Sequence, residues 1–148
     1  MKTNIYILLF FLVVFCITDC KKYPEGPRIS LRTKKIRIQG VWYTELFLVN
    51  GEDSTANYII PYVNCGCYNI GPKGYSIYKI GSQGRDGSWD FSNNKNNIVF
   101  YNNNGQGLPP LFVGDKVEWV IQRLTDKQFW LKRNDNNKEY YLKLKNPN

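Results

Sequence analysis

The sequence predicts an all-β domain, a single antiparallel barrel or, as the alternative, a β-sandwich. After residue 40, short apolar and alternating stretches recur at regular spacing and are separated by turn-forming residues. Aromatic residues make up 16% of the chain, a share that favours strands and aromatic packing. No stretch in this region has a convincing helical pattern. Closure of about eight strands into an up-and-down barrel would leave no exposed sheet edges.

The first element in chain order is a secretory signal over residues 1–19. Lys2 precedes an apolar stretch, residues 5–15, which is too short to span a bilayer comfortably. Cys20 follows at the exit of this segment. The arrangement resembles the lipobox of bacterial lipoproteins, in which the cysteine becomes the first mature residue and carries acyl chains such as palmitate. Asp19 departs from that pattern, which has Gly, Ala or Ser before the cysteine.

The lipobox resemblance implies a lipoprotein that is anchored to the membrane through lipid on Cys20. The expected location is the bacterial cell envelope, at the outer membrane. The alternatives are plain secretion and an uncleaved anchor. Residues 20–29 contain two prolines and are predicted to form an extended tether. Residues 30–148 are then the folded domain, beginning with one or two helical turns over 30–37 with Ser30 as the N-cap.

The first strand is predicted from Gly40 to the turn signal Asn50-Gly51. Strict alternation divides it into two faces. The first face holds Trp42, Thr44, Leu46 and Leu48, and the second holds Tyr43, Glu45, Phe47 and Val49.

The later strands follow from the same alternation between turn signals. A strand over 58–63 contains Pro61, which marks an edge or a bulge. The longest irregular piece is 102–114, which is rich in Gly and Pro. The remaining predicted strands cover 75–80, 88–91, 98–101, 117–124, 128–133 and 139–145.

The charge and the absent residue types limit the possible functions. The net charge of +8 attracts phosphates, but the export signal argues against a nucleic-acid partner. We interpret the charge as a solvated basic surface beside a membrane-proximal tether. Histidine is absent, which removes the usual near-neutral acid–base residue and the commonest metal ligand. The acids are scattered, and no nucleophile motif is present. Five aspartates sit in or beside turn signals: Asp53, Asp86, Asp115, Asp126 and Asp135. We therefore expect no enzyme, no catalytic residues, no metal and no cofactor.

Cys65 and Cys67 remain as a thiol pair once Cys20 is lipidated. An oxidising envelope permits a disulfide between them, and the intervening Gly66 supplies the backbone freedom of such a tight ring. A redox role and a zinc site are both disfavoured. The pair is not a Cys-x-x-Cys motif in a βαβ unit, and two thiolates without histidine leave zinc under-coordinated.

Several motifs resemble the small lipocalin-like lipoproteins of Bacteroidetes-type bacteria. Gly40-Val41-Trp42 looks like the Gly-x-Trp motif of lipocalins, in which a short helical turn precedes a tryptophan that plugs the closed end of the barrel. Further matching pieces lie at 20–27, 87–91, 119–125 and 129–132 with 141–144. The chain departs from lipocalins in its short length, the lack of a C-terminal helix and the lack of a clear arginine to stack on the tryptophan.

The resemblance implies a non-enzymatic barrel that holds a small hydrophobic ligand. An eight-stranded barrel can also be filled by its own side chains, so the same aromatic residues could be plain core. In that case the protein would be a scaffold or interaction lipoprotein with an envelope protein as partner, and the 102–114 loop would serve docking. The candidate ligand-lining residues are Trp42, Trp89, Phe91, Trp119 and Trp130.

Lipidation of Cys20 is tested by the Cys20→Ala variant. We expect it to remain unprocessed or to appear in the soluble fraction, because acylation is the proposed anchor. The measurement is partitioning between detergent and aqueous phases, with apparent mass as a second readout. Normal processing and full membrane retention of Cys20→Ala would contradict the prediction.

Overall fold

A computed structural model describes residues 32–59, 67–77, 85–102 and 115–147, and the structural statements below concern these residues. Two α-helices and a 3-10 turn occur, α2 (Lys34–Ile38), α3 (Thr55–Ile59) and η1 (Asn93–Lys95). The strands are β1 (Gly40–Val49), β2 (Glu52–Asp53), β3 (Cys67–Ile70), β4 (Gly74–Ile77), β5 (Arg85–Ser92), β6 (Asn97–Asn102), β7 (Lys116–Leu124), β8 (Gln128–Asp135) and β9 (Lys138–Lys145).

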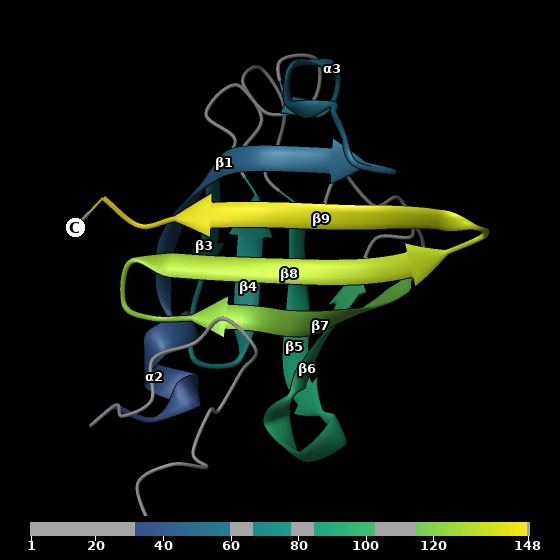
Figure 1. Cartoon of the computed structure of the whole chain (residues 1–148). Coiled ribbons are helices and arrows are strands. Elements are labelled where there is room, and N and C mark those ends of the chain that lie inside the picture. Colours follow the sequence, from purple (N-terminus) through teal and green to yellow (C-terminus); the bar gives the residue numbers. More distant parts are fainter. Residues whose placement is uncertain (1–31, 60–66, 78–84, 103–114, 148) are drawn as a thin grey trace, which may run out of the picture.

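The strands form a closed antiparallel barrel. The sheet order is β2-β1-β3-β4-β5-β6-β7-β8-β9, and β1 also pairs with β9. Eight strands therefore form the ring, and the two-residue β2 extends one edge of β1. In Figure 1, β1, β9, β8 and β7 form the front wall, and β3 to β6 cross behind them at a steep angle. The predicted up-and-down barrel is confirmed, and the β-sandwich alternative is wrong because the β1–β9 pairing joins the two walls.

A β-bulge in β1 corrects the predicted division of this strand into two faces. The register against β9 shifts between Thr44 and Leu46, so Glu45 is the extra residue. Trp42 and Phe47 are five positions apart, yet both are buried inside the barrel. Strict alternation would place them on opposite faces. The bulge adds the one residue that brings both aromatic side chains into the core.

Helix α2 begins later than expected and covers one end of the barrel. Its N-cap is Thr33, whose hydroxyl accepts a hydrogen bond from the Ile36 N–H, whereas the predicted cap Ser30 lies outside the described residues. The Trp42 indole donates to the Ile38 carbonyl at 2.8 Å, which ties the first strand to the helix. This end is called the α2 end below, and the opposite end, where β1 and β8 finish, is called the rim.

The predicted strand over 58–63 is wrong in the part that the structure describes, and 60–63 lie outside it. Tyr58 and Ile59 belong to α3. The Asp53 carboxylate accepts the Thr55 N–H at 2.9 Å, and the Thr55 hydroxyl accepts the Phe47 N–H at 2.8 Å. These polar groups start a helical turn and attach it to β1, and they outweigh the apolar pattern that follows. The sequence also gave no prediction for β3.

Inward-facing side chains on β1, β9, β8 and β7 form three layers along the barrel. The strand pairing places most of their members opposite one another, while Trp42 and Trp119 lie beside their layers without a directly opposite partner in them. The layer at the α2 end holds Trp42, Leu144, Phe129 and Leu124. The middle layer holds Phe47, Leu142, Leu131 and Ile121. The layer nearest the rim holds Val49, Tyr140, Arg133 and Trp119.

The two layers nearer the α2 end are filled. Their eight side chains are at most 1% exposed, and the Trp42 and Phe129 ring centroids are 5.5 Å apart. Such packing leaves little empty space around each ring. The α2 half of the front wall is therefore an ordinary hydrophobic core.

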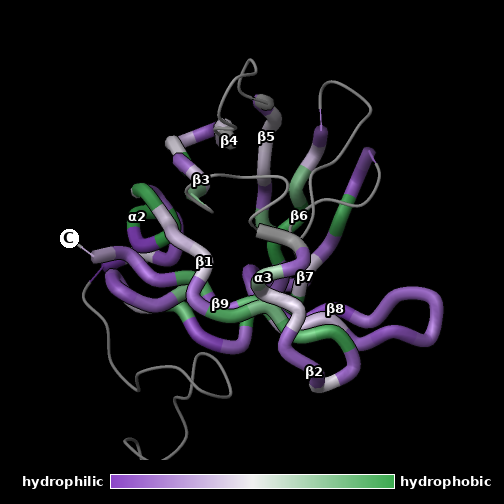
Figure 2. The backbone as a smooth tube through the Cα atoms, turned by 90° about the horizontal axis from the view of Figure 1, so that it is seen from above, coloured by the Kyte–Doolittle hydropathy of each residue, from purple (hydrophilic) through white to green (hydrophobic). Residues whose placement is uncertain are grey.

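Two hairpin turns at the rim depend on residues that tolerate positive φ. Asn50 and Gly51 join β1 to β2 with φ of 52° and 83°, and Asn136 and Asn137 join β8 to β9 with φ of 48° and 61°. The Asn50 side-chain oxygen also accepts the Glu139 N–H at 2.8 Å. The two turns are thereby linked, as Figure 2 shows where β2 and the β8–β9 hairpin lie on the same side of the ring.

Trp42→Ala tests whether Trp42 seals the α2 end. Its side chain is 0% exposed, so we expect a loss of about 3–5 kcal/mol in the free energy of unfolding. Tyr101→Ala is the matched control, because Tyr101 is an aromatic residue that is 39% exposed on the outer face. Urea unfolding measures both. A loss under about 1 kcal/mol for Trp42→Ala would contradict the role of Trp42 as a seal.

Candidate functional site

The rim layer differs from the two filled layers because it contains a charge. Arg133 follows Phe129 and Leu131 on the inner face of β8, and its side chain is only 10% exposed. Its guanidinium carbon lies 5.2 Å from the centre of the Trp119 ring and 4.8 Å from the centre of the Tyr140 ring. Arg133 is therefore held between aromatic rings on both neighbouring strands.

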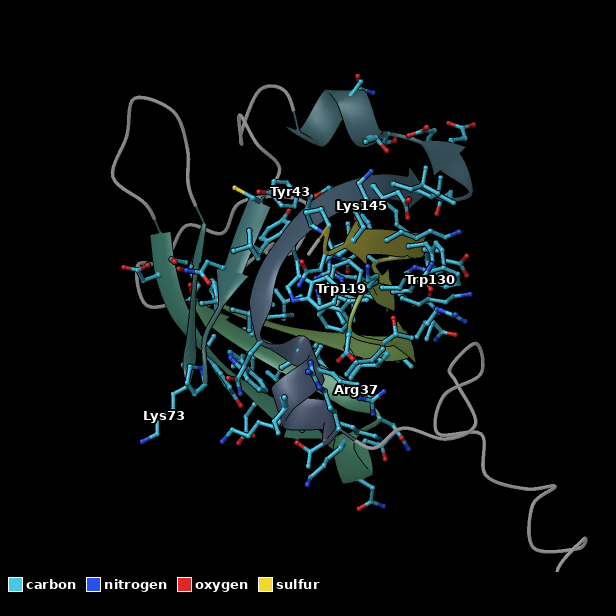
Figure 3. The ribbon with its side chains drawn as sticks, turned by 90° about the vertical axis from the view of Figure 1, so that its left-hand side faces the viewer. Arg37, Tyr43, Lys73, Trp119, Trp130 and Lys145 are labelled. Atoms are coloured by element: carbon cyan, nitrogen blue, oxygen red, sulfur yellow. The ribbon has the colours of Figure 1, made fainter. Side chains whose placement is uncertain are left out.

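The aromatic wall around Arg133 extends onto β1. Tyr140 stacks on Phe47, with ring centroids 6.1 Å apart and planes at 18°. Trp119 is fully buried, whereas Tyr140 and Val49 are only partly buried against the core. Figure 3 shows Trp119 in the middle of the barrel, above the level of Arg37 beside α2. The inner wall near the rim is thus aromatic, partly exposed and positively charged.

The polar contacts of Arg133 are incomplete. Its Nε and Nη2 atoms are shielded from solvent and make no hydrogen bond among the described residues. The nearest carboxylate is that of Asp135, 3.4 Å from Nη2, on a side chain that is 41% exposed. A guanidinium has five N–H donors and no acceptor, so Arg133 has more donors than the described residues satisfy. An unsatisfied buried donor costs about 1–3 kcal/mol, and such a cost is common at functional sites.

A hollow of about 450 Å³ adjoins this position at the rim. Asp135 belongs both to the hollow and to the contact with Arg133. The other lining residues come from the two linked turns, and all are polar: Asn50, Asn134, Asn136, Asn137, Lys138 and Glu139. The lining does not include Arg133 or the aromatic residues around it.

Two of the five predicted ligand-lining residues, Trp42 and Trp119, are fully buried in the barrel. Trp89 and Phe91 pack on the core from β5, with ring centroids 5.4 Å apart, and the Trp89 indole donates to the Gly71 carbonyl at 2.9 Å. These two also line a separate hollow of about 210 Å³ beside Lys35 and Lys73. Only Trp119 of these four belongs to the rim layer.

Trp130 lies on the outer face of β8, so it does not line the barrel interior. The reason is strand alternation, because its neighbours Phe129 and Leu131 point inward. The Trp130 ring is covered by cations from both adjacent strands. The Arg123 guanidinium carbon lies 5.0 Å and the Lys143 ammonium 4.4 Å from the ring centre.

Arg37 is a second buried arginine, and it has a structural contact that Arg133 lacks. It is 3% exposed, and its Nη1 donates a hydrogen bond to the Leu124 carbonyl of β7. This bond links α2 to the barrel wall. Its Nε and Nη2 have no hydrogen-bond partner among the described residues. The sequence analysis identified neither arginine as a site residue. A signal existed for Arg133, because the alternation that turns Phe129 and Leu131 inward continues to position 133.

Of the three cysteines predicted to be lipidated or disulfide-bonded, two lie outside the described residues. Cys67 is disulfide-bonded, while Cys65 and the lipidation candidate Cys20 lie outside. Within the described ranges no cluster of metal-ligating side chains occurs, and none of the helices has the length and apolar character needed to cross a bilayer. Burial raises the pKa of the Tyr68 hydroxyl inside the barrel above its ordinary value.

Comparisons with known proteins relate the fold to structures from Bacteroides. No family model matches the chain, and no curated protein matches its sequence. An uncharacterized protein from Bacteroides eggerthii is structurally similar, with a TM-score of 0.50 and 12% identity over 73% of this chain and 98% of that one. A lipocalin-like protein from Bacteroides uniformis gives a TM-score of 0.41 with 12% identity over 72% and 96%. At this identity the likeness to the first protein supports the fold alone.

Replacing the two buried arginines should separate their roles. Arg37→Met removes two unsatisfied donors, as Arg133→Met does, but it also leaves the buried Leu124 carbonyl without its donor, so we expect it to be the more destabilising variant, with a loss of about 1 kcal/mol or more in the free energy of unfolding. Arg133→Met loses two ring contacts but removes two unsatisfied donors, so we expect a change of less than about 1 kcal/mol. Urea unfolding measures both variants. A larger loss for Arg133→Met than for Arg37→Met would mean that Arg133 serves stability.

Proposed function

We propose that this chain is a non-enzymatic, lipid-anchored protein of the bacterial cell envelope that binds a small hydrophobic ligand at the rim of its barrel. The observation that supports the proposal is the difference in burial between the three layers of inward-facing side chains. Two layers are filled with fully buried apolar side chains, whereas in the third Trp119 is buried and Tyr140 and Val49 are only partly buried. Partly exposed aromatic surface inside a barrel is available to an apolar ligand, at about 25 cal/mol per Å² of surface buried.

The proposed anchor suits a protein that collects a ligand near a membrane. The proposed tether over residues 20–29 can extend to about 33–36 Å. This length would let the barrel turn its rim toward or away from the bilayer. The outer membrane is the proposed location, on the strength of the signal and the cysteine at its exit.

A scaffold function is the second candidate, and the filled α2 half of the barrel favours it. Packed layers leave no room for a ligand there. Native mass spectrometry of the full chain from its own envelope distinguishes the two functions. A co-purifying small molecule would support ligand binding, and a co-purifying protein would support the scaffold.

Val49→Phe should weaken ligand binding by narrowing the partly exposed layer. Val49 packs beside Tyr140 at the rim, so a larger side chain would occupy the proposed ligand space. Val120→Phe is the matched control, because Val120 is 42% exposed on the outer face. The measurement is quenching of tryptophan emission by a fluorescent fatty acid. Equal binding by the two variants would contradict a site at the rim.

A further inference from the structure

Helix α2 and three turns that are far apart in the sequence meet at the α2 end of the barrel. The Lys34 ammonium donates to the Lys95 carbonyl of η1 at 2.8 Å. Arg32 pairs with Asp126 of the β7–β8 turn, with 3.6 Å between their charged atoms. The β3–β4 turn shares with α2 the hollow of about 210 Å³ described above. These elements therefore present one continuous outer surface at this end.

The surface of the α2 end is basic and has an exposed apolar side chain near its middle. Ile36 of α2 is 53% exposed, and Figure 3 shows Lys73 of the β3–β4 turn at the level of Arg37 beside α2. The cations of this surface are Arg32, Lys34, Lys35, Lys73, Lys95 and Lys127. The acids are Asp90, Glu118 and Asp126. Cations therefore predominate among the side chains that the structure describes here.

The rim has the opposite balance of charge. Its acids, on β2 and at the ends of β5, β7, β8 and β9, are Glu52, Asp53, Asp86, Asp115, Asp135 and Glu139. The cations around them are Lys116, Lys132, Arg133 and Lys138. The described part of the barrel is thus positive at the α2 end and negative at the rim. Near an anionic surface, this separation turns the α2 end toward that surface and the rim away from it.

The chain that leads to the proposed lipid anchor joins the barrel at the same end. Arg32 is the first residue that the structure describes, and it lies beside the β7–β8 turn. Cys20 precedes it in the sequence and is followed directly by Lys21 and Lys22. A lipid on Cys20 would therefore bring the basic α2 end, rather than the acidic rim, close to the bilayer.

We propose that the α2 end docks on the phosphate head groups of an anionic membrane leaflet, with the rim facing away from the bilayer. Lys35, Lys73 and Lys127 contact the phosphates, and Ile36 enters the interfacial region between them. The inference rests on the proposed lipid anchor and adds the orientation of the barrel. Single lysines bind such a surface weakly, but several on one face act together.

The outer face of β7, β8 and β9 is the competing surface, because it also combines cations with aromatic rings. There the cations already cover a ring of the protein itself, since Arg123 and Lys143 lie 5.0 Å and 4.4 Å from the centre of Trp130. This face also includes the pair of Lys132 with Glu139, at 2.6 Å. Its cations are partly compensated, so the α2 end is favoured.

Lysine footprinting on the full chain in nanodiscs tests the orientation. The discs contain phosphatidylcholine alone or phosphatidylcholine with added phosphatidylglycerol, and mass spectrometry measures the acetylation rate of each lysine. We expect Lys35, Lys73 and Lys127 to react about threefold or more slowly in the anionic discs, because head groups cover them. Lys138 at the rim should react at the same rate in both. At about 1 M salt the Debye length falls to about 3 Å, so the protection should disappear.

A pair of double variants separates position from net charge. Lys35→Gln combined with Lys73→Gln removes two cations from the α2 end and should abolish the protection of Lys127. Lys116→Gln combined with Lys138→Gln is the matched control, because it removes the same charge from exposed positions at the rim. The control should keep the protection of Lys127.

Three outcomes would contradict the proposal, and they are distinguishable. Protection of Lys132 and Lys143 without protection of the α2 end would mean that the barrel lies on its side. Equal acetylation rates in the two kinds of disc, with the chain still bound to them, would overturn the orientation and leave the proposed anchor standing. Failure of the chain to stay with either disc would overturn the anchor itself. The comparison in the unaltered chain needs no variant, so it stands even if a double variant does not fold.

Discussion

The pairing of β1 with β9 is the contact on which the rest of the structure depends. Without it the sheet would have two open edges and the inward side chains would face water. The pairing requires the bulge at Glu45, because only the extra residue allows Trp42 and Phe47 to enter the same core. The bulge at Glu45 therefore joins two structural requirements, closure of the ring and filling of its interior, and a second register shift on β7 lets Ile121 and Leu124 both face inward.

The α2 end depends on this closure. The helix is only five residues long and too short to be stable by itself. It is held by the Trp42 indole on the Ile38 carbonyl and by Arg37 on the Leu124 carbonyl. One of these bonds comes from the first strand of the ring and the other from β7. The helix thus covers an end of the barrel that the closed ring has already formed. At the opposite end, the rim, the layer of inward-facing side chains is packed less completely.

Local patterns in the sequence predicted most of the fold, and long-range contacts account for most of the errors. The Asn50-Gly51 turn and the strands β7 to β9 follow from alternation and turn chemistry, which act over a few residues. The Glu45 bulge could not be predicted, because it is defined by a partner strand far along the chain. Helix α3 was missed because Asp53 and Thr55 bond to the backbone in a way that composition does not show. At the candidate site, Trp119 was identified as an aromatic residue, but Arg133 was treated as surface because a charge is rarely buried.

The order of strands also has a kinetic consequence. From β3 to β9 each strand pairs with the next one along the chain, and such local contacts form quickly. The closing pair is different, since Tyr43 meets Lys145 roughly a hundred residues later, and the loss of chain entropy on closing so long a loop delays it. The last step of folding is then the docking of β1 onto β9. Until that step is complete, the chain presents two unpaired strand edges, at β1 and β9, which can pair with strands of another chain.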